Sequence, residues 1–258
     1  MSLKELKKQY KDDLRAERQR YDKTRSDIKA QHKAKVELLY ESGEIVRPKE
    51  PPKRALLEEI GNAVTHGIGS VFAIVAFILM MIASDTISEY IGASIYFFGL
   101  FVMFTMSCLY HAFPHGTAVK RLFRRFDYSS IYLLIGATFA PPLLNVVGGK
   151  FGIIFFVIQW VIIAAGISLV GVFGPTRLRF VHIPMYVILG WSALMLMPSM
   201  IASSFPLAMW ILAGGVVYTL GIIPFAIDVK VSHFIWHFFV LFGAVVQWVG
   251  IYFYIYAS

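Results

Sequence analysis

Long apolar stretches separated by short polar segments make up most of this chain, and only the N-terminal part lacks them. A helix that crosses a bilayer needs about 20 mostly apolar residues. Seven stretches have this length: 64–84, 91–111, 128–147, 151–173, 181–202, 206–227 and 233–256. Because a bilayer satisfies no backbone polar groups, we predict an all-α fold, a bundle of seven transmembrane helices.

Residues 1–54 form a separate charged arm. They hold 16 of the 24 Lys and Arg residues and 10 of the 16 Asp and Glu residues, a net charge of +6 against +2 on all the rest. Apolar residues recur in it near helical or heptad spacing, at Leu3, Leu6, Tyr10, Leu14, Tyr21 and Ile28. This pattern predicts a solvated helix; the alternatives are a weak coiled coil that joins copies into a homo-oligomer, or a basic helix on anionic lipid. The proline-rich residues 46–52 are expected to link the arm to a membrane domain over 55–258.

Composition and charge constrain the protein class and its orientation. A chain that is 57% hydrophobic and only 16% charged does not suit a soluble domain of this size. Residues 1–35 contain no apolar signal segment, which predicts a cytosolic N-terminus. The inside loops then carry seven basic residues, and the outside loops carry only Lys150. Because short cytoplasmic loops are enriched in Lys and Arg, we expect the N-terminus inside and the C-terminus outside.

Polar residues at the predicted cytosolic ends of the spans suggest a metal site. His233 and His237 open the last span four residues apart, on one face of a helix. His111 ends the second span and Asp127 begins the third, at the same side of the membrane. Three histidine ligands with a fourth position for water are typical of a hydrolytic zinc site. The only cysteine is Cys108, so a site made of several cysteines is excluded.

Two further side chains suit hydrolytic chemistry. Asp127 could take a proton from the attacking water as a general base, or orient a histidine. Ser107, one turn before His111, could hydrogen-bond the same water or polarise a substrate carbonyl. The alternatives are that each histidine is an interfacial side chain, that Asp127 caps its helix or pairs with an arginine, and that Ser107 packs helices. The remaining polar residues are interpreted as interface or capping residues: His66, His115, His182, Glu58, Glu59 and Asn62.

Four motifs together resemble those of the hemolysin III family and of the related progestin and adiponectin receptors. They are Glu59-x2-Asn62-x2-Thr65-His66, Ser107-x3-His111, Asp127-Tyr128-Ser129 and Ser232-His233-x3-His237. The resemblance covers about residues 58–254. It implies a cytosol-facing zinc ion bound by the three motif histidines, with Asp127 bound through water, and kinship with lipid amidases of the ceramidase type. It also implies a bacterial inner-membrane protein linked to membrane lipid homeostasis.

We therefore expect a metal-dependent hydrolase of a lipid amide or ester. Its substrate would enter sideways between helices kinked at Pro141-Pro142, Pro198 and Pro224. The alternatives are a non-enzymatic membrane-state sensor or receptor with structural zinc, and a pore-forming hemolysin. In each case the expected partner is a membrane lipid and not a nucleic acid.

Overall fold

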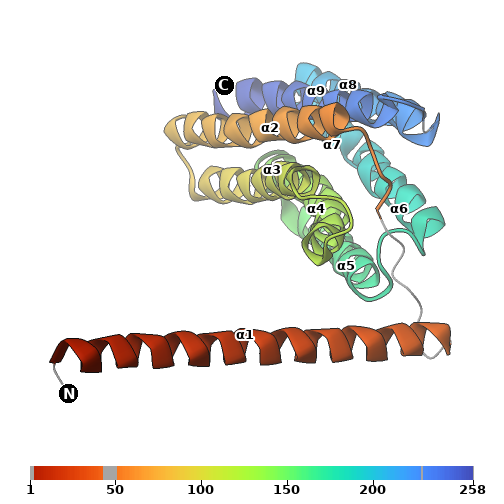
Figure 1. The fold of residues 1–258 in the computed structure, drawn as a ribbon. Helices are drawn as coiled ribbons and strands as arrows, with labels where there is room; N and C mark the ends of the chain where they lie inside the picture. The colour runs from red at the N-terminus through yellow and green to blue at the C-terminus, as the bar shows by residue number, and fades with distance from the viewer. Residues whose placement is uncertain (1–2, 43–50, 228, 258) are drawn as a thin grey trace. The chain divides into compact units, whose positions relative to one another are not determined.

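The computed structural model describes residues 3–42, 51–227 and 229–257, and over these ranges it contains helices and no strand. Two compact units make up the chain, residues 1–49 and residues 50–258. The α-helices are α1 (Leu3–Glu41), α2 (Leu56–Ile82), α3 (Ile87–Ala112), α4 (Ala118–Pro142), α5 (Gly149–Phe173), α6 (Arg179–Trp191), α7 (Met197–Ser203), α8 (Phe205–Ile227) and α9 (Ser232–Ile251). The predicted all-α class is confirmed (Figure 1).

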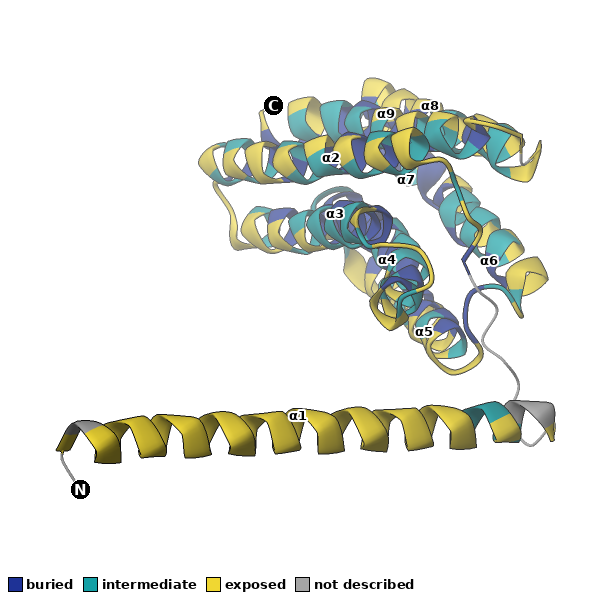
Figure 2. Cartoon of the chain, in the orientation of Figure 1, coloured by how far each residue is buried: buried dark blue, intermediate teal, exposed yellow. Residues whose placement is uncertain are grey.

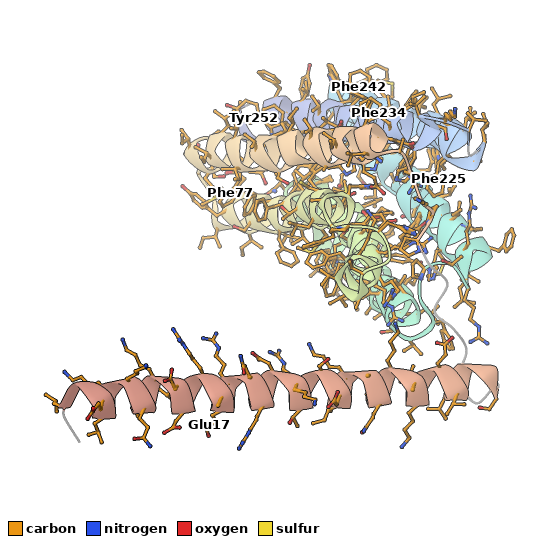
Figure 3. All side chains as sticks on the ribbon, viewed as in Figure 1. Glu17, Phe77, Phe225, Phe234, Phe242 and Tyr252 are labelled. Atoms are coloured by element: carbon orange, nitrogen blue, oxygen red, sulfur yellow. The ribbon has the colours of Figure 1, made fainter. Side chains whose placement is uncertain are left out.

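The arm of the first unit is one long helix, α1, as predicted. Its apolar side chains, such as Leu14 and Tyr21, are exposed, and charged side chains such as Glu17 project from it along its length (Figure 3). Residues 43–50, which include most of the predicted linker, lie outside the described residues.

Seven helical stretches in the described part of the second unit are long and apolar enough to cross a membrane, which confirms the predicted number. They are Leu56–Ile82, Ile87–Ala112, Ala118–Val147, Gly149–Phe173, Arg179–Ser203, Phe205–Ile227 and Ser232–Tyr256. All seven begin before the predicted residue, and the shift is largest in two of them: α2 begins at Leu56 and α4 at Ala118, against predicted starts at 64 and 128. The first turns of both helices carry charged residues, and their low hydropathy led to the prediction of loops at these positions.

The bundle brings the ends of distant helices together. α3 packs against α2 and α4, and α9 packs against α2 and α8, so α2 lies beside both α3 and α9 (Figure 1). The buried core between them is apolar and includes Ala73, Phe104, Leu134, Leu207 and Ala244. The outward faces are apolar too, and many of their residues are exposed (Figure 2). Such a surface is stable in lipid and not in water.

Two glycines allow the close approach of α2, α3 and α4. A Cβ on Gly69 of α2 would overlap the ring of Phe104, and one on Gly99 of α3 would overlap Ala137 and lie 2.9 Å from the Leu133 carbonyl oxygen. Small residues at such positions let transmembrane backbones pack tightly.

Irregular turns interrupt two of the three spans in which prolines predicted kinks. α4 ends at Pro142 and continues as a π-helical turn over Leu143–Val147. A 3-10 turn over Ser192–Leu196 joins α6 to α7, and Pro198 lies in the first turn of α7. α8 continues through Pro224. Proline removes a backbone donor, and the wider or tighter turns accommodate the loss.

Candidate metal centre

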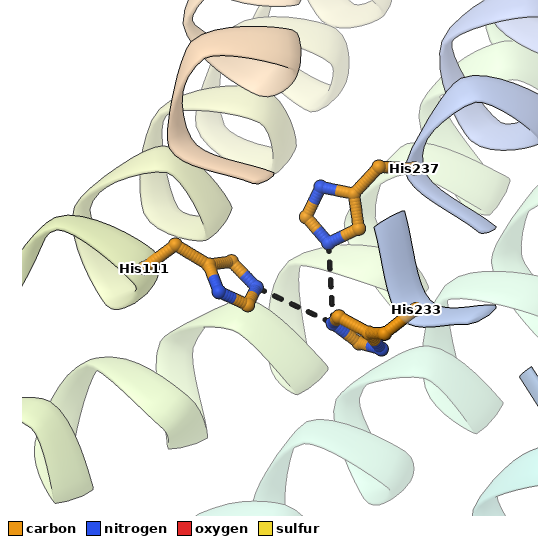
Figure 4. A group of neighbouring side chains, drawn as sticks. All are labelled: His111, His233 and His237. Carbon is orange, nitrogen blue, oxygen red and sulfur yellow. Dashed lines mark hydrogen bonds between the residues drawn. The ribbon is translucent and has the colours of Figure 1, made fainter. Parts of the chain in front are cut away.

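Three histidines from α3 and α9 converge in the bundle. His111 lies in the last turn of α3, and His233 and His237 lie in the first two turns of α9. The Nε2 atom of His233 is 3.3 Å from Nε2 of His111 and 3.2 Å from Nε2 of His237 (Figure 4). In the described part of the chain these residues form the one group of at least three His, Cys, Asp or Glu side chains whose ligand atoms all lie within 4.8 Å of one another.

This geometry fits a metal ion. Zinc binds histidine nitrogens at about 2.0–2.1 Å, and tetrahedral angles then place two ligand nitrogens roughly 3.3 Å apart. The two Nε2 separations at His233 have this value. Hydrogen bonds alone explain this arrangement poorly. An imidazole nitrogen can donate one hydrogen bond or accept one, but His233 Nε2 lies beside two other histidine nitrogens. The three histidines could therefore bind a metal ion.

The α9 pair is placed by a strained residue. Val231 precedes the helix with φ 60° and ψ −2°, the left-handed conformation that β-branched side chains rarely adopt. Among the described residues it is the only non-glycine with positive φ. Strain of this kind persists where the surrounding structure determines the backbone path. Here it sets the start of α9 immediately before Ser232 and His233.

Asp127 and Ser107 lie beside the histidines. Asp127 is in the third turn of α4, and it lines one cavity together with Ser107 of α3, His233 and His237. The alternative that Asp127 caps its helix is wrong, because α4 begins at Ala118 with Thr117 as its N-cap. Its carboxylate is also close enough to His111 to interact with it electrostatically. The structure thus brings together all five residues that the sequence singled out.

A cavity of about 180 Å³ adjoins this group. Asp127, Ser107, His233 and His237 line its polar end. The rest of the wall comes mainly from apolar side chains of α4, α6, α8 and α9, among them Leu134, Phe139, Val187, Ile211, Trp236 and Val240. A polar reactive end on a mostly apolar cavity is typical of a site for an apolar ligand.

Sequence reasoning missed the side chains around His111. Glu59 and Asn62 were interpreted as caps, but Ala55 is the N-cap of α2 and both side chains turn to His111 instead. Glu59 Oε2 lies 2.6 Å from His111 Nδ1, and the Asn62 amide nitrogen lies 3.3 Å from the same atom. The spacing of Glu59, Asn62 and His66, i, i+3 and i+7, places all three on one helix face and could have revealed them.

The other histidines have different surroundings. His66 is buried and stacks on His237, with ring centroids 3.8 Å apart. His182 is buried elsewhere, where its Nδ1 atom lies 2.9 Å from the Tyr132 hydroxyl. His115 is exposed in the α3–α4 loop. His66 therefore supports the candidate site by packing, and the other two take no part in it.

Seven apolar helices around a histidine cluster define a polytopic membrane protein with a candidate metal centre. The family model described as Haemolysin-III related matches residues 54–248, and the chain belongs to this family. It is 34% identical over 206 residues to "Hemolysin-3" of Bacillus cereus, an alignment that covers 77% of this chain and 92% of the relative. It is 30% identical over 203 residues to "Hemolysin-3 homolog" of Bacillus subtilis, covering 76% of this chain and 94% of the relative.

A mammalian relative supports the wider kinship. The chain is 30% identical over 214 residues to human "Monocyte to macrophage differentiation factor", an alignment that covers 80% of this chain and 88% of that protein. The resemblance to the hemolysin III family and its receptor relatives is thereby confirmed. The α1 helix lies outside the residues that the family model matches. With the seven apolar helices, this kinship identifies an integral membrane protein.

Proposed function

We propose that the protein is a zinc-dependent hydrolase of a lipid amide or ester, with His111, His233 and His237 as the metal ligands. One observation carries the proposal: the Nε2 atoms of His111 and His237 lie 3.3 and 3.2 Å from His233 Nε2 at the polar end of a mostly apolar cavity. A nitrogen-only ligand set suits zinc, which takes three protein ligands in hydrolytic sites and leaves one position open.

The chain's own residues supply the remaining chemistry. A zinc ion bound there would activate water and polarise a carbonyl group. Asp127 accepts the proton of the attacking water as general base. Ser107, which lines the cavity with Asp127, would hydrogen-bond the same water or polarise the substrate carbonyl. The reaction class is hydrolysis of an acyl bond.

The cavity points to a lipid as substrate. Its mostly apolar walls suit an acyl chain, and Asp127, His233 and His237 line it beside the candidate metal site. Residues of α6 and α8 line it together, among them Gly190, Trp191 and Thr219. The lipid would enter sideways from the bilayer between these helices. With the N-terminus in the cytosol, the reactive end faces the cytosolic side, and the reaction would serve membrane lipid homeostasis.

The experiment compares metal content and turnover in wild type and Asp127→Asn. Purified protein in lipid nanodiscs is analysed for zinc and then incubated with a fluorogenic short-chain ceramide and a matched ester. Wild type should hold one zinc per chain and release product. Asp127→Asn should keep its zinc and lose about 100-fold or more in turnover, as expected for a lost general base. Equal turnover in both proteins, or wild type without zinc, would overturn the proposal.

A second function is a lipid sensor in which zinc is structural. The apolar cavity favours it as well, because a bound lipid needs no reaction to stabilise the bundle. The same preparation separates the two: a sensor would hold zinc and gain thermal stability with ceramide but release no product. The name Hemolysin-3 of the Bacillus cereus relative suggests membrane lysis, and a pore of this kind would release a trapped dye from vesicles.

A further inference from the structure

A partly buried carboxylate links His111 to a buried lysine. One oxygen of Glu59, Oε2, lies 2.6 Å from His111 Nδ1, and the other, Oε1, lies 3.0 Å from Lys120 Nζ. The three side chains come from α2, α3 and α4. Glu59 contacts Nδ1 of the His111 ring, whereas His233 lies at its Nε2 atom. Glu59 therefore contacts the ring nitrogen of His111 that is not directed at the other candidate ligands.

The charge pattern predicts that Lys120 is a solvated charge in a cytoplasmic loop, but the structure buries it. Its side chain is 1% exposed. Its ammonium group donates to Glu59 and, at 3.0 Å, to the Phe113 carbonyl oxygen, and it lies 4.9 Å from the centroid of the Tyr110 ring. Burial of an ammonium group is costly unless it is paired and hydrogen-bonded. The carboxylate, the carbonyl oxygen and the aromatic ring together compensate the burial of Lys120.

We infer that Glu59 is a positioning residue for the metal ligand His111, an inference that rests on the proposed function. A carboxylate only accepts hydrogen bonds, so the His111 proton must lie on Nδ1 and point to Glu59. The Nε2 lone pair then faces His233 and His237. Carboxylates in this place fix the tautomer and the ring orientation of metal-binding histidines and strengthen the ligand. Lys120 holds the second carboxylate oxygen and balances its charge.

The three histidines differ in this respect. The Nδ1 atom of His237 is buried and has no hydrogen-bond partner among the described residues. His111 alone has a carboxylate within salt-bridge distance of its ring in the described part of the chain. Glu59 therefore acts on one ligand, and its removal should weaken metal binding without removing a ligand.

The chain offers a matched control in Glu58. It is the neighbouring residue in the first turn of α2, its side chain has the same 12% exposure as that of Glu59, and it is ion-paired with Arg54 at 3.5 Å. Glu58→Gln and Glu59→Gln thus remove equal charge from equally buried sites one residue apart. Only the second removes the carboxylate from His111.

The test measures zinc affinity of full-length protein in nanodiscs by competition with a chromophoric chelator, and the absorption spectrum of the cobalt(II)-loaded form. Glu59→Gln should raise the zinc dissociation constant 10- to 100-fold and alter the cobalt spectrum. Glu58→Gln should leave both as in wild type. The double variant Glu59→Gln/Lys120→Met leaves no unpaired buried charge, so it should fold and show the same loss of affinity if the single variant does not fold.

The outcomes separate the two proposals. If wild type binds zinc and either Glu59→Gln or the double variant binds it with the same affinity, the role of Glu59 is overturned. The metal centre itself would then still be supported. Equal loss of affinity in Glu58→Gln and Glu59→Gln would show that charge alone matters, and would also overturn it. Wild type that binds no zinc would overturn the proposed function itself.

Discussion

At the scale of the residue, neighbours and not residue type decide the role of a buried histidine. His111 and His182 are both buried, and both have a polar partner at Nδ1. The Nε2 atom of His111 faces another histidine nitrogen at 3.3 Å, whereas that of His182 is buried without a partner among the described residues. Only the first arrangement can hold a metal.

Replacement of His237 by alanine tests the ligand set. The variant should lose its zinc, because two remaining nitrogens bind the ion weakly. It should also lose the rise in melting temperature that zinc gives wild type, since a ligand at 100 times its dissociation constant stabilises by about 2.7 kcal/mol. Zinc content and thermal unfolding with and without zinc measure both effects. His182→Ala is the control and should keep its zinc; equal zinc content in the His237 and His182 variants would contradict the ligand set.

Local patterns revealed some of these residues and hid others. The four-residue spacing on one helix identifies His233 and His237 as a pair, and topology adds His111, Asp127 and Ser107. Glu59 and Lys120 were missed because each has an ordinary local explanation, a helix cap and a cytoplasmic loop charge. Glu59 contacts His111, 52 residues further along the chain, and Lys120, 61 residues further along.

At the scale of the element, close packing of α2, α3 and α4 holds the site in register. These helices carry Glu59, His111 and Asp127, and Gly99 lets α3 approach the α4 backbone. A side chain there would push apart two helices that both contribute to the site. The α9 pair joins this group because α9 packs on α2.

Gly99→Ala should therefore destabilise the bundle. The added Cβ would overlap Ala137 and crowd the Leu133 carbonyl, and overpacking of this kind typically costs about 1–3 kcal/mol. Gly171→Ala in α5 is the matched control, because a Cβ there meets no atom within 4 Å. It should be neutral or raise stability, since alanine favours helix by about 1 kcal/mol over glycine. Thermal unfolding in one detergent compares the two, and an equal melting temperature for both variants would contradict the packing argument.

The α1 helix has a narrow apolar seam. Leu14, Tyr21 and Ile28 are exposed and seven residues apart, with Leu3 and Tyr10 on the same side, and charged residues occupy most other positions. A seam this narrow resembles a coiled coil more than a helix lying on lipid, which needs a broader apolar face. We propose that α1 pairs with the α1 of a second copy.

Deletion of residues 2–45 should lower the oligomeric state in detergent and leave a folded bundle that keeps its zinc. Replacing Leu14, Tyr21 and Ile28 together by glutamine should lower it as well, because this keeps the helix and its charge but removes the seam. Light scattering coupled to size exclusion gives the mass of each. Unchanged mass, with loss of salt-sensitive binding to anionic vesicles, would show that the arm binds lipid instead.

At the scale of the whole molecule, we expect the odd number of spans to place the two ends of the membrane domain on opposite sides of the bilayer. The three candidate ligands would then lie on one side of the bilayer. His111 is at the C-terminal end of α3, and this end lies beside the N-terminal end of α9, which carries His233 and His237. The charge pattern predicts that this is the cytosolic side.

Cysteine labelling tests this orientation. Cys108 is the only cysteine, so Cys108→Ser gives a clean background. In that background we expect Lys150→Cys to react with a membrane-impermeant maleimide in intact cells, and His115→Cys to react only after permeabilisation. Both positions are exposed, so access to reagent is matched. The reverse pattern would place the histidine cluster on the outside.

The sequence by itself determined the number of spans and the helical class. Both depend on hydrophobicity and hydrogen bonding within one segment, since a stretch of about 20 apolar residues satisfies its backbone only as a helix in lipid. It also determined that His233 and His237 share a face, because helix geometry is local.

Only the tertiary structure decided which side chains meet. The distance between His233 and His111 depends on how α9 and α3 pack beside α2. The contact of Glu59 with Lys120 depends on how α2 and α4 both pack against α3. Such contacts join residues 61 to 122 positions apart, and no local preference encodes them. Packing of small and large residues between helices sets these distances, and with them the convergence of three nitrogens on one point.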